Sequence, residues 1–288
     1  MIYLLLPAYN EELSLPKLLP KIKEELIKRG KEFKLVVVDD GSTDDTASIL
    51  EGFKNDDKLN LTVLTHPINR GLGETERDGF EYIANIANDE DVIIRVEGDD
   101  THDPKFILDI YNKLNEGFDV VNTSRFQPGG DQVGLNWYRR TLSKAANMFM
   151  KFMFNIKGVK DYSCGFRGYR VPVIKNSIAI FGNNFVQLRG LGFTATLEVI
   201  VKLKMLGCKF AEVPFVLRYD MKESESKMVS SVTTLGYLTM AILYHWPFGG
   251  WKKQYKGMDK IYISDPIKAI EKFNSRALRT KTASKISI

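Results

Sequence analysis

The sequence predicts an α/β protein with a mainly parallel sheet and helices on both faces. Through the first half of the 288-residue chain, short apolar runs alternate with stretches in which apolar residues recur at helical spacing. Alternation at this pitch is typical of parallel strands joined by crossover helices. Polar clusters rich in acids follow three of the runs, at Pro7–Glu12, Asp39–Asp45 and Glu97–Asp103. Ligands of such sheets bind beyond the carboxyl ends of the strands, so these clusters indicate a functional site.

Each of the first four predicted strands is followed by a predicted helix. The strands are the apolar runs Ile2–Leu6, Leu35–Val38, Leu61–Leu64 and Asp91–Val96, with a fifth around Val120. The helices are Pro16–Arg29, Thr43–Phe53, Glu74–Ala87 and Pro104–Asn115. In the first helix, for example, Leu18, Leu19, Ile22 and Leu26 recur on one face.

The pattern changes in the second half of the chain. A glycine-rich loop at Gln127–Gly134 precedes a long predicted helix, Trp137–Ile156. A turn at Asp161–Arg167, a helix at Phe193–Leu206, and a turn and strand at Cys208–Arg218 complete the predicted domain.

Composition favours an ordinary globular protein of the cytoplasm. Hydrophobic residues make up 44% and charged residues 27% of the chain, which excludes wholesale disorder. Two cysteines are too few for a disulfide framework or a cysteine-rich metal site, and they suit a reducing compartment. The first residues form an apolar strand pattern without the basic region and cleavage site of a secretory signal.

The net charge of +5 is concentrated at the carboxyl end. From Lys252 onward there are ten Lys and Arg residues against three acids, so this tail carries +7 and the remainder −2. A near-neutral body with a basic end points to contact with an anionic surface, and not to a nucleic-acid groove; a merely solubilising tail is the alternative.

The 24 residues from Met228 to Trp251 carry no formal charge. Their apolar centre, Leu235–Trp246, is twelve residues long, whereas a membrane span needs about twenty. Aromatic residues followed by Lys252 and Lys253 are typical of a helix lying in the membrane surface. We therefore expect an interfacial helix and basic extension at 228–288, after a domain at 1–227. A helix packed on its own domain is the alternative.

The acids after the fourth strand predict a divalent-cation site. Glu97 and Asp99 are one residue apart at a strand end and can face the same ion, while Gly98 lets the backbone approach a nucleotide. Mg²⁺ or Mn²⁺ needs few protein carboxylates when phosphate oxygens and water complete its coordination.

Two other nucleotide-binding classes are excluded by spacing. Asn69–Gly73 follows the third strand and lacks the last glycine of a dinucleotide fingerprint, and the chain has no phosphate-binding loop of the Gly-x4-Gly-Lys type. By contrast, Asp40 ends the second strand, where a carboxylate can accept hydrogen bonds from a base or a ribose.

Together, five motifs resemble the family-2 inverting glycosyltransferases with the GT-A fold. They are Pro7–Glu12, Val37–Asp44, Asn69–Gly71, Glu97–Asp99 and Gly165–Arg167. The chain is most similar to the branch containing dolichol-phosphate mannose synthase and its bacterial polyprenyl-phosphate relatives, and the similarity covers roughly residues 1 to 230. One departure is that Glu97 stands where the family has aspartate, which puts the ion geometry and donor choice in question.

The resemblance implies roles for particular residues. Nucleoside and donor contacts would come from Pro7, Ala8, Tyr9, Glu11, Val38, Asp40, Gly98 and Lys227. The metal would be held by Glu97, Asp99 and Thr101, and the phosphates would be met by Arg125, Arg139, Arg218 and, more loosely, Lys227. The donor would be a GDP- or UDP-linked hexose.

The acceptor follows from the chemistry of inversion. A sugar hydroxyl needs a general base, whereas a lipid phosphate is already an anion and needs only cations to position it. Between Gln187 and Val199 the one acid is Glu198. We therefore expect transfer to a polyprenyl phosphate by an enzyme peripherally associated with the inner face of the cell membrane. The alternatives are transfer to a hydroxyl of a polysaccharide or glycolipid, with Glu198 as base, and a non-catalytic nucleotide-sugar-binding protein.

Overall fold

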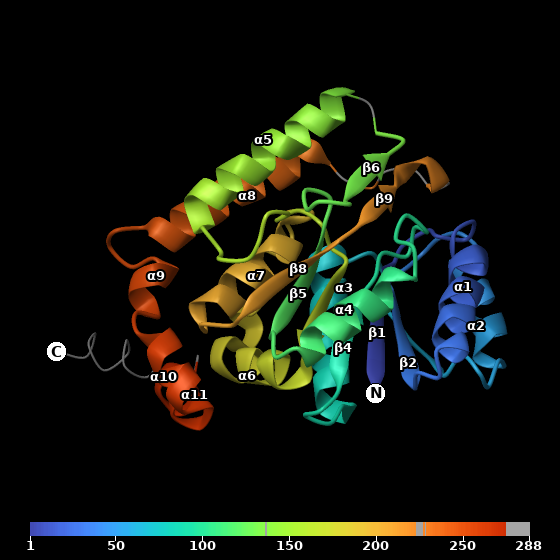
Figure 1. The fold of residues 1–288 in the computed structure, drawn as a ribbon, viewed down its shortest axis with the longest axis horizontal. Coiled ribbons are helices and arrows are strands. Elements are labelled where there is room, and N and C mark those ends of the chain that lie inside the picture. The colour runs from blue at the N-terminus through green and yellow to red at the C-terminus, as the bar shows by residue number, and fades with distance from the viewer. Residues whose placement is uncertain (136, 223–226, 228, 275–288) are drawn as a thin grey trace.

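In the computed structural model a seven-stranded sheet forms the centre of the molecule (Figure 1). The structure describes residues 1–135, 137–222, 227 and 229–274, without the side chain of residue 139. The strand order is β3-β2-β1-β4-β7-β5-β8. These strands are β1 Ile2–Ala8, β2 Phe33–Asp39, β3 Leu61–Thr65, β4 Val92–Arg95, β5 Val120–Ser124, β7 Arg167–Arg170 and β8 Phe210–Pro214. All neighbouring pairs are parallel except those made by β7.

Helices cover both faces of this sheet, as predicted. One apolar core lies between the sheet and α1 (Leu15–Lys28), α2 (Thr46–Lys54) and α4 (Phe106–Asn115). The other core lies beneath α3 (Leu72–Ile86), α5 (Trp137–Phe154), α6 (Val171–Phe181) and α7 (Thr194–Met205). Alternation along β1 explains the division, because Leu4 and Leu6 enter the first core and Tyr3 and Leu5 the second.

Some strands and helices in the second half of the chain were not predicted, because their apolar residues follow no clear strand or helix periodicity. β7 has the sequence Arg-Gly-Tyr-Arg, without an apolar run, and it fits the sheet because Arg167 and Tyr169 are buried. The helix α6 is apolar on most sides, so no helical stripe marks it. Within the predicted glycine-rich loop, β6 (Asp131–Val133) pairs with β9 (Val216–Arg218) in a small separate sheet.

One side of the segment after residue 229 packs on the preceding domain. The helix α8 (Ser230–His245) buries Met240 and Tyr244 in the same core as α6 and α7. The short helices α9 (Trp251–Gln254), α10 (Met258–Ser264) and α11 (Pro266–Phe273) follow it. Among the described residues, none of the helices has the length and apolar character needed to cross a membrane.

Candidate active site

The carboxyl ends of β1, β2 and β4 meet at one edge of the sheet. β1 pairs in parallel with both β2 and β4, so the residues that follow these strands become neighbours. Pro7 and Ala8 end β1 and Val38 lies near the end of β2, all three buried. Gly98 lies against β1, because a Cβ there would be 3.0 Å from the carbonyl oxygen of Pro7. The lack of a side chain at Gly98 thus lets this segment pack closely on β1, and its close approach to a nucleotide stays a prediction.

Asp99 is held by a hydroxyl and an ammonium. Thr101 donates to its Oδ1 from the hydroxyl at 2.6 Å and from the backbone N–H at 3.2 Å. The Nζ of Lys222 lies 2.5 Å from Oδ2. Burial is the largest single influence and opposes ionisation of Asp99, but the positive charge of Lys222 and the hydrogen bonds from Lys222 and Thr101, with the other groups around it, together outweigh burial, so the pKa of the carboxyl is lowered. Asp99 is thus an anion with a cation already beside it.

Glu97 is paired with an arginine inside the sheet. Arg95, which is 1% exposed, forms an ion pair with Glu97 on one side and with Glu76 of α3, at 2.9 Å, on the other. The Glu97 side chain is 20% exposed, so its carboxylate lies between the buried pair and the open side of the site. The neutral ring of His102 accepts a hydrogen bond from the backbone N–H of Glu97 through Nδ1, at 3.1 Å.

A second cation reaches the site from the segment before α8. Lys227 donates to the carbonyl oxygen of Asn10 at 2.9 Å and forms an ion pair with Oε1 of Glu11. The other carboxylate oxygen of Glu11 is buried without a hydrogen-bond partner. The side chain of Glu11 lies next to Gly98, so this buried and unpartnered oxygen is close to the strand ends.

Asp40 organises the loop after β3. It accepts hydrogen bonds from the backbone N–H groups of Arg70 and Gly71, both at 2.8 Å, and contacts Nδ1 of His66 at 2.6 Å. Its carboxylate therefore fixes the Asn69–Gly71 motif beside the end of β2, while Tyr9 lies half-buried after β1.

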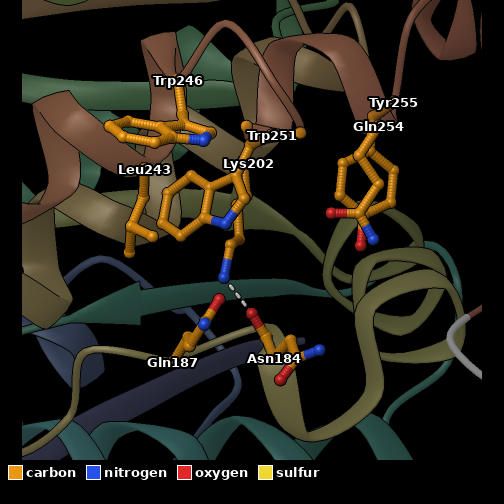
Figure 2. Close-up of a pocket in the computed structure, with 10 residues that line it drawn as sticks. Asn184, Gln187, Lys202, Leu243, Trp246, Trp251, Gln254 and Tyr255 are labelled. Atoms are coloured by element: carbon orange, nitrogen blue, oxygen red, sulfur yellow. Dashed lines mark hydrogen bonds between the residues drawn. The ribbon is translucent and has the colours of Figure 1, made fainter.

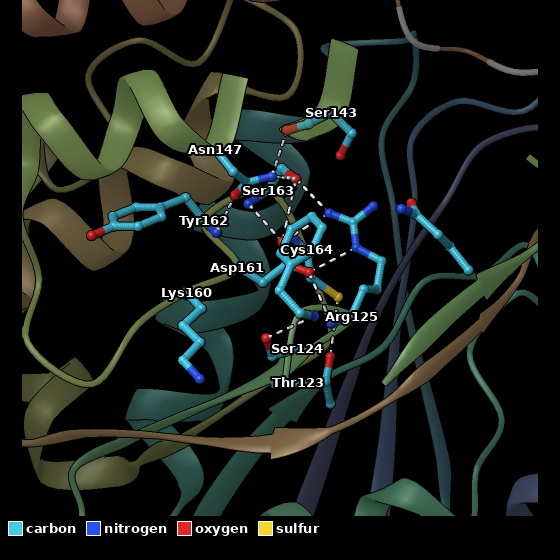
Figure 3. Close-up of polar contacts among 12 residues, drawn as sticks. Thr123, Ser124, Arg125, Ser143, Asn147, Lys160, Asp161, Tyr162, Ser163 and Cys164 are labelled. Carbon is cyan, nitrogen blue, oxygen red and sulfur yellow. Dashed lines mark hydrogen bonds and ion pairs between the residues drawn. The ribbon is translucent and has the colours of Figure 1, made fainter. Parts of the chain in front are cut away.

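Arg125 supports the turn that contains Asp161. Its guanidinium binds Asp161 with two nitrogens, at 2.7 and 2.8 Å, and donates to the hydroxyl of Ser163 at 2.7 Å (Figure 3). Asn147 of α5 donates to the same hydroxyl at 3.2 Å. Arg125 is 8% exposed, so its first role here is to join β5, this turn and α5.

The other two arginines differ in how they relate to the acids. Arg218 ends β9, and its backbone N–H donates to the carbonyl oxygen of Thr101 at 3.2 Å. Its side chain is 44% exposed and binds Asp220. Arg139 lies in α5, and its side chain is outside the described part of the structure.

Glu198 is not placed as a general base. It is fully buried in α7, where its two oxygens accept hydrogen bonds from the backbone N–H groups of Gln187 and Leu188, at 2.9 and 2.7 Å. Lys202 forms an ion pair with the same carboxylate. A carboxylate that already holds these donors inside a core is not free to take a proton from an acceptor. This correction removes the base on which the hydroxyl-acceptor alternative depended.

A cavity of about 250 Å³ lies on the other side of Lys202, between α7, α8 and α9 (Figure 2). Its walls include Trp246 and Trp251, and Asn184 and Gln187 lie at its lower edge in the view. The ammonium of Lys202 lies 4.5 Å from the ring centre of Trp251. None of the residues predicted for the site lines this cavity.

The residues at the strand ends fit a divalent cation. Glu97, Asp99 and Thr101 offer hard oxygen atoms, and the unpartnered oxygen of Glu11 lies beside them. In the part of the chain that the structure describes, no three His, Cys, Asp or Glu side chains are grouped so as to hold an ion. An ion here would combine these few oxygens with those of a diphosphate, as Mg²⁺ commonly does.

Sequence reasoning missed three charged residues of this site. Arg95 interrupts an apolar strand two residues before Glu97, a spacing that places both on one face, and this was the available signal. Glu76 and Lys222 reach the acids from other elements, and no local pattern marks them.

A GT-A fold with acidic side chains at the carboxyl edge defines the class of nucleotide-sugar glycosyltransferases. Residues 3–177 match the protein family described as "Glycosyl transferase family 2". The chain therefore belongs to glycosyl transferase family 2, which confirms the resemblance drawn from its motifs.

The chain is similar in sequence to two curated relatives. The chain is 28% identical over 171 residues to polyprenol monophosphomannose synthase of Mycolicibacterium smegmatis, covering 59% of this chain and 62% of that protein. It is 30% identical over 200 residues to undecaprenyl-phosphate 4-deoxy-4-formamido-L-arabinose transferase of Shewanella sediminis, covering 68% and 57%. The chain thus spans less than two thirds of the length of either relative.

Solved structures establish the fold. Glucosyl-3-phosphoglycerate synthase from Mycobacterium tuberculosis, crystallised with Mn²⁺, UDP and glucosyl-3-phosphoglycerate, superimposes with a TM-score of 0.54 at 16% identity, covering 84% of this chain and 78% of that one. TarS 1–349 from S. aureus, crystallised with UDP-GlcNAc, gives 0.53 at 19%, covering 92% and 73%.

Proposed function

We propose that this protein transfers a hexose, with inversion, from a UDP- or GDP-linked donor to a polyprenyl phosphate at the cytoplasmic face of a membrane. The observation that carries the proposal is that cations and acids are paired at the strand ends, next to helices with apolar outer faces. The names of the two curated relatives, which specify polyprenol and undecaprenyl phosphate, support the same acceptor class.

The donor would bind across the ends of β1, β2 and β4. The nucleoside would lie near Tyr9 and Asp40, and the diphosphate near Glu97 and Asp99 with Mg²⁺ or Mn²⁺. When bound, such a cation neutralises negative charge on the departing nucleoside diphosphate. Lys222 and Lys227 would move from their carboxylate partners to phosphate oxygens, since an ammonium binds either anion.

The acceptor phosphate would attack without a general base. A phosphate is an anion at neutral pH, so positioning by Arg218, Lys227 and the arginines of the 125–139 region replaces proton removal. The burial of Glu198 is consistent with this mechanism and disfavours a hydroxyl acceptor.

The lipid would be reached from the α5 and α8 side of the molecule. β1 runs upward from the N-terminus in Figure 1, so the carboxyl edge of the parallel strands faces the side on which these helices lie together. Lys227, which contacts Glu11, is three residues before the start of α8. The outward residues of the two helices are Trp137, Tyr138, Leu142, Met148 and Phe152 on α5, and Leu235, Leu238 and Ile242 on α8.

A donor and acceptor panel tests the proposal. Purified protein with Mn²⁺ should release nucleoside diphosphate from one hexose donor only when vesicles containing undecaprenyl phosphate are present. Vesicles with undecaprenol, which has the same chain and a hydroxyl in place of the phosphate, are the matched control. Release with the alcohol or with a polysaccharide acceptor would contradict the phosphate acceptor, and no release with any pair would indicate a binding protein.

A further inference from the structure

Arg95 lies beneath the site, and its partner Glu97 extends from it toward the open side. Arg95 ends β4 and points to the same side of the sheet as Glu97, two residues later. It is 1% exposed and, with Arg167, is one of the two largest fully buried side chains among the described residues. A guanidinium with this little solvent must keep its anionic partners, because an unpaired buried charge is costly.

Glu76 of α3 holds Arg95 in place from the buried side. Its carboxylate lies 2.9 Å from Nε of Arg95 and accepts a hydrogen bond from the hydroxyl of Thr196 at 3.2 Å. Glu76 is 2% exposed. Arg95 is therefore held in place by α3, and Glu97 is the more exposed of its two partners.

Gly165 closes this arrangement from the opposite side. A Cβ at residue 165 would lie 2.1 Å from Nη1 of Arg95 and 2.7 Å from Oε1 of Glu97. The backbone of the turn before β7 thus lies directly on the ion pair. Only glycine permits this approach, and the pair has no room to rearrange toward the turn.

We propose that Arg95 is a positioning residue that holds Glu97 through one carboxylate oxygen and weakens the affinity of the site for a free divalent cation. The proposal rests on the divalent-cation site of the proposed function. A cation that binds Glu97 must compete with a guanidinium that cannot leave, and Asp99 is likewise occupied by Lys222. A diphosphate adds the negative charge that the site lacks, so the cation enters most favourably together with the nucleotide.

The variant that tests this replaces Arg95→Met together with Glu76→Gln. It removes one positive and one negative charge, so the net charge of the cluster is unchanged, and the carboxylate left without its partner is Glu97, which is partly exposed. We expect the double variant to bind Mn²⁺ without nucleotide about tenfold more tightly than wild type, as measured by loss of the free Mn²⁺ signal in electron paramagnetic resonance. Its turnover should fall, because Glu97 is no longer oriented.

Two further variants locate the effect. Adding Glu97→Gln to the double variant should abolish the gain, and Glu76→Gln alone, which keeps Arg95 on Glu97, should produce none. An unchanged Mn²⁺ affinity in the folded double variant, or a gain that survives Glu97→Gln, overturns the proposal.

If the double variant does not fold, Glu97→Asp provides the same test and leaves the buried ion pair between Arg95 and Glu76 intact. The carboxylate is withdrawn by one methylene from Arg95, so Mn²⁺ should bind more tightly, and equal or weaker binding overturns the proposal. Because these titrations contain neither donor nor acceptor, their result is independent of which sugar or lipid the enzyme uses.

Discussion

At the scale of single residues, three acids of the candidate site each have a cation beside them. Glu97 is paired with Arg95, Asp99 with Lys222, and Glu11 with Lys227. These pairs keep a concentration of carboxylates stable in the free protein, since like charges alone would repel. They also mean that ligand binding is an exchange of partners, in which a lysine leaves a carboxylate for a phosphate.

Asp99→Asn should abolish turnover, by about 10³-fold or more, because the amide cannot replace an anionic ligand for a divalent cation. The matched control is Asp100→Asn. Asp100 is also buried and paired, with Lys21 at 2.5 Å, and it has a positive φ of 58° that asparagine tolerates. We expect less than a tenfold loss from the control in the same nucleoside-diphosphate release assay. Equal losses in the two variants would contradict a special role for Asp99.

His102 makes the stability of the protein depend on pH. Burial lowers the pKa of its ring to about 4, while Glu97 and Asp99 only partly oppose this. The unfolded chain therefore binds a proton below about pH 6.5 that the folded protein does not bind until about pH 4, so stability falls as the pH falls through this window. The free energy of unfolding should decrease by about 3 kcal/mol between pH 7 and pH 4 from this group alone.

Urea unfolding at several pH values measures this effect. His102→Asn retains a side-chain acceptor for the N–H of Glu97 but does not titrate. The difference in unfolding free energy between wild type and this variant should therefore shrink as the pH falls from 7 to 4. A difference that is constant with pH would show that the ring is not buried in its neutral form.

At the scale of elements, α8 depends on close contact with α7. A Cβ at Gly236 would lie 1.9 Å from the hydroxyl oxygen of Thr194 and 2.9 Å from its Cβ, and Thr194 is fully buried. Gly236→Val should therefore lower the free energy of unfolding by about 2 kcal/mol or more, through overpacking. Gly249→Ala, at a glycine with open space around it, should change it by less than about 0.5 kcal/mol. Thermal or urea unfolding would show the difference, and equal effects would contradict the tight contact.

The elements that could be predicted from the sequence are those with a local period. β1, β2 and β4 each contain an uninterrupted apolar run of three or more residues, and α1 has a clear apolar stripe, so each was found to within a few residues. In contrast, β7 owes its place to tertiary contacts, in which Arg167 donates to the carbonyl oxygens of Tyr162 and Thr196. No local pattern predicts a strand with two arginines.

The candidate site shows the same limit. The acids at the strand ends could be found because parallel strands bring their carboxyl ends together. Two of the charged residues around them could not, since Glu76 comes from α3 and Lys222 from the segment before α8; Lys227 was predicted only through the family resemblance. Glu198 illustrates the opposite error, because a position in sequence gives no indication that its carboxylate is enclosed by backbone N–H groups.

At the scale of the whole molecule, the sheet edge with the candidate site and the helices α5 and α8 lie on the same side (Figure 1). On α8, Leu238 and Ile242 are 48% and 57% exposed. Exposed apolar side chains cost free energy in water, and covering the exposed half of each by an apolar phase contributes about 1 kcal/mol. A lipid surface that covers this side would place the acceptor phosphate at the strand ends.

Replacing Leu238→Ser and Ile242→Ser should therefore separate membrane binding from chemistry. We expect at least a tenfold loss of binding to anionic vesicles and of turnover on undecaprenyl phosphate in those vesicles. Turnover on a short-chain, water-soluble isoprenyl phosphate should be unchanged, because neither residue contacts the acids. The matched control is Ile263→Ser with Ile267→Ser, since these isoleucines of α10 and α11 are 70% and 69% exposed but lie away from α5. If the control loses vesicle binding equally, or if the α8 variant loses turnover on the short acceptor as well, the α8 face is not the surface through which this protein reaches its lipid.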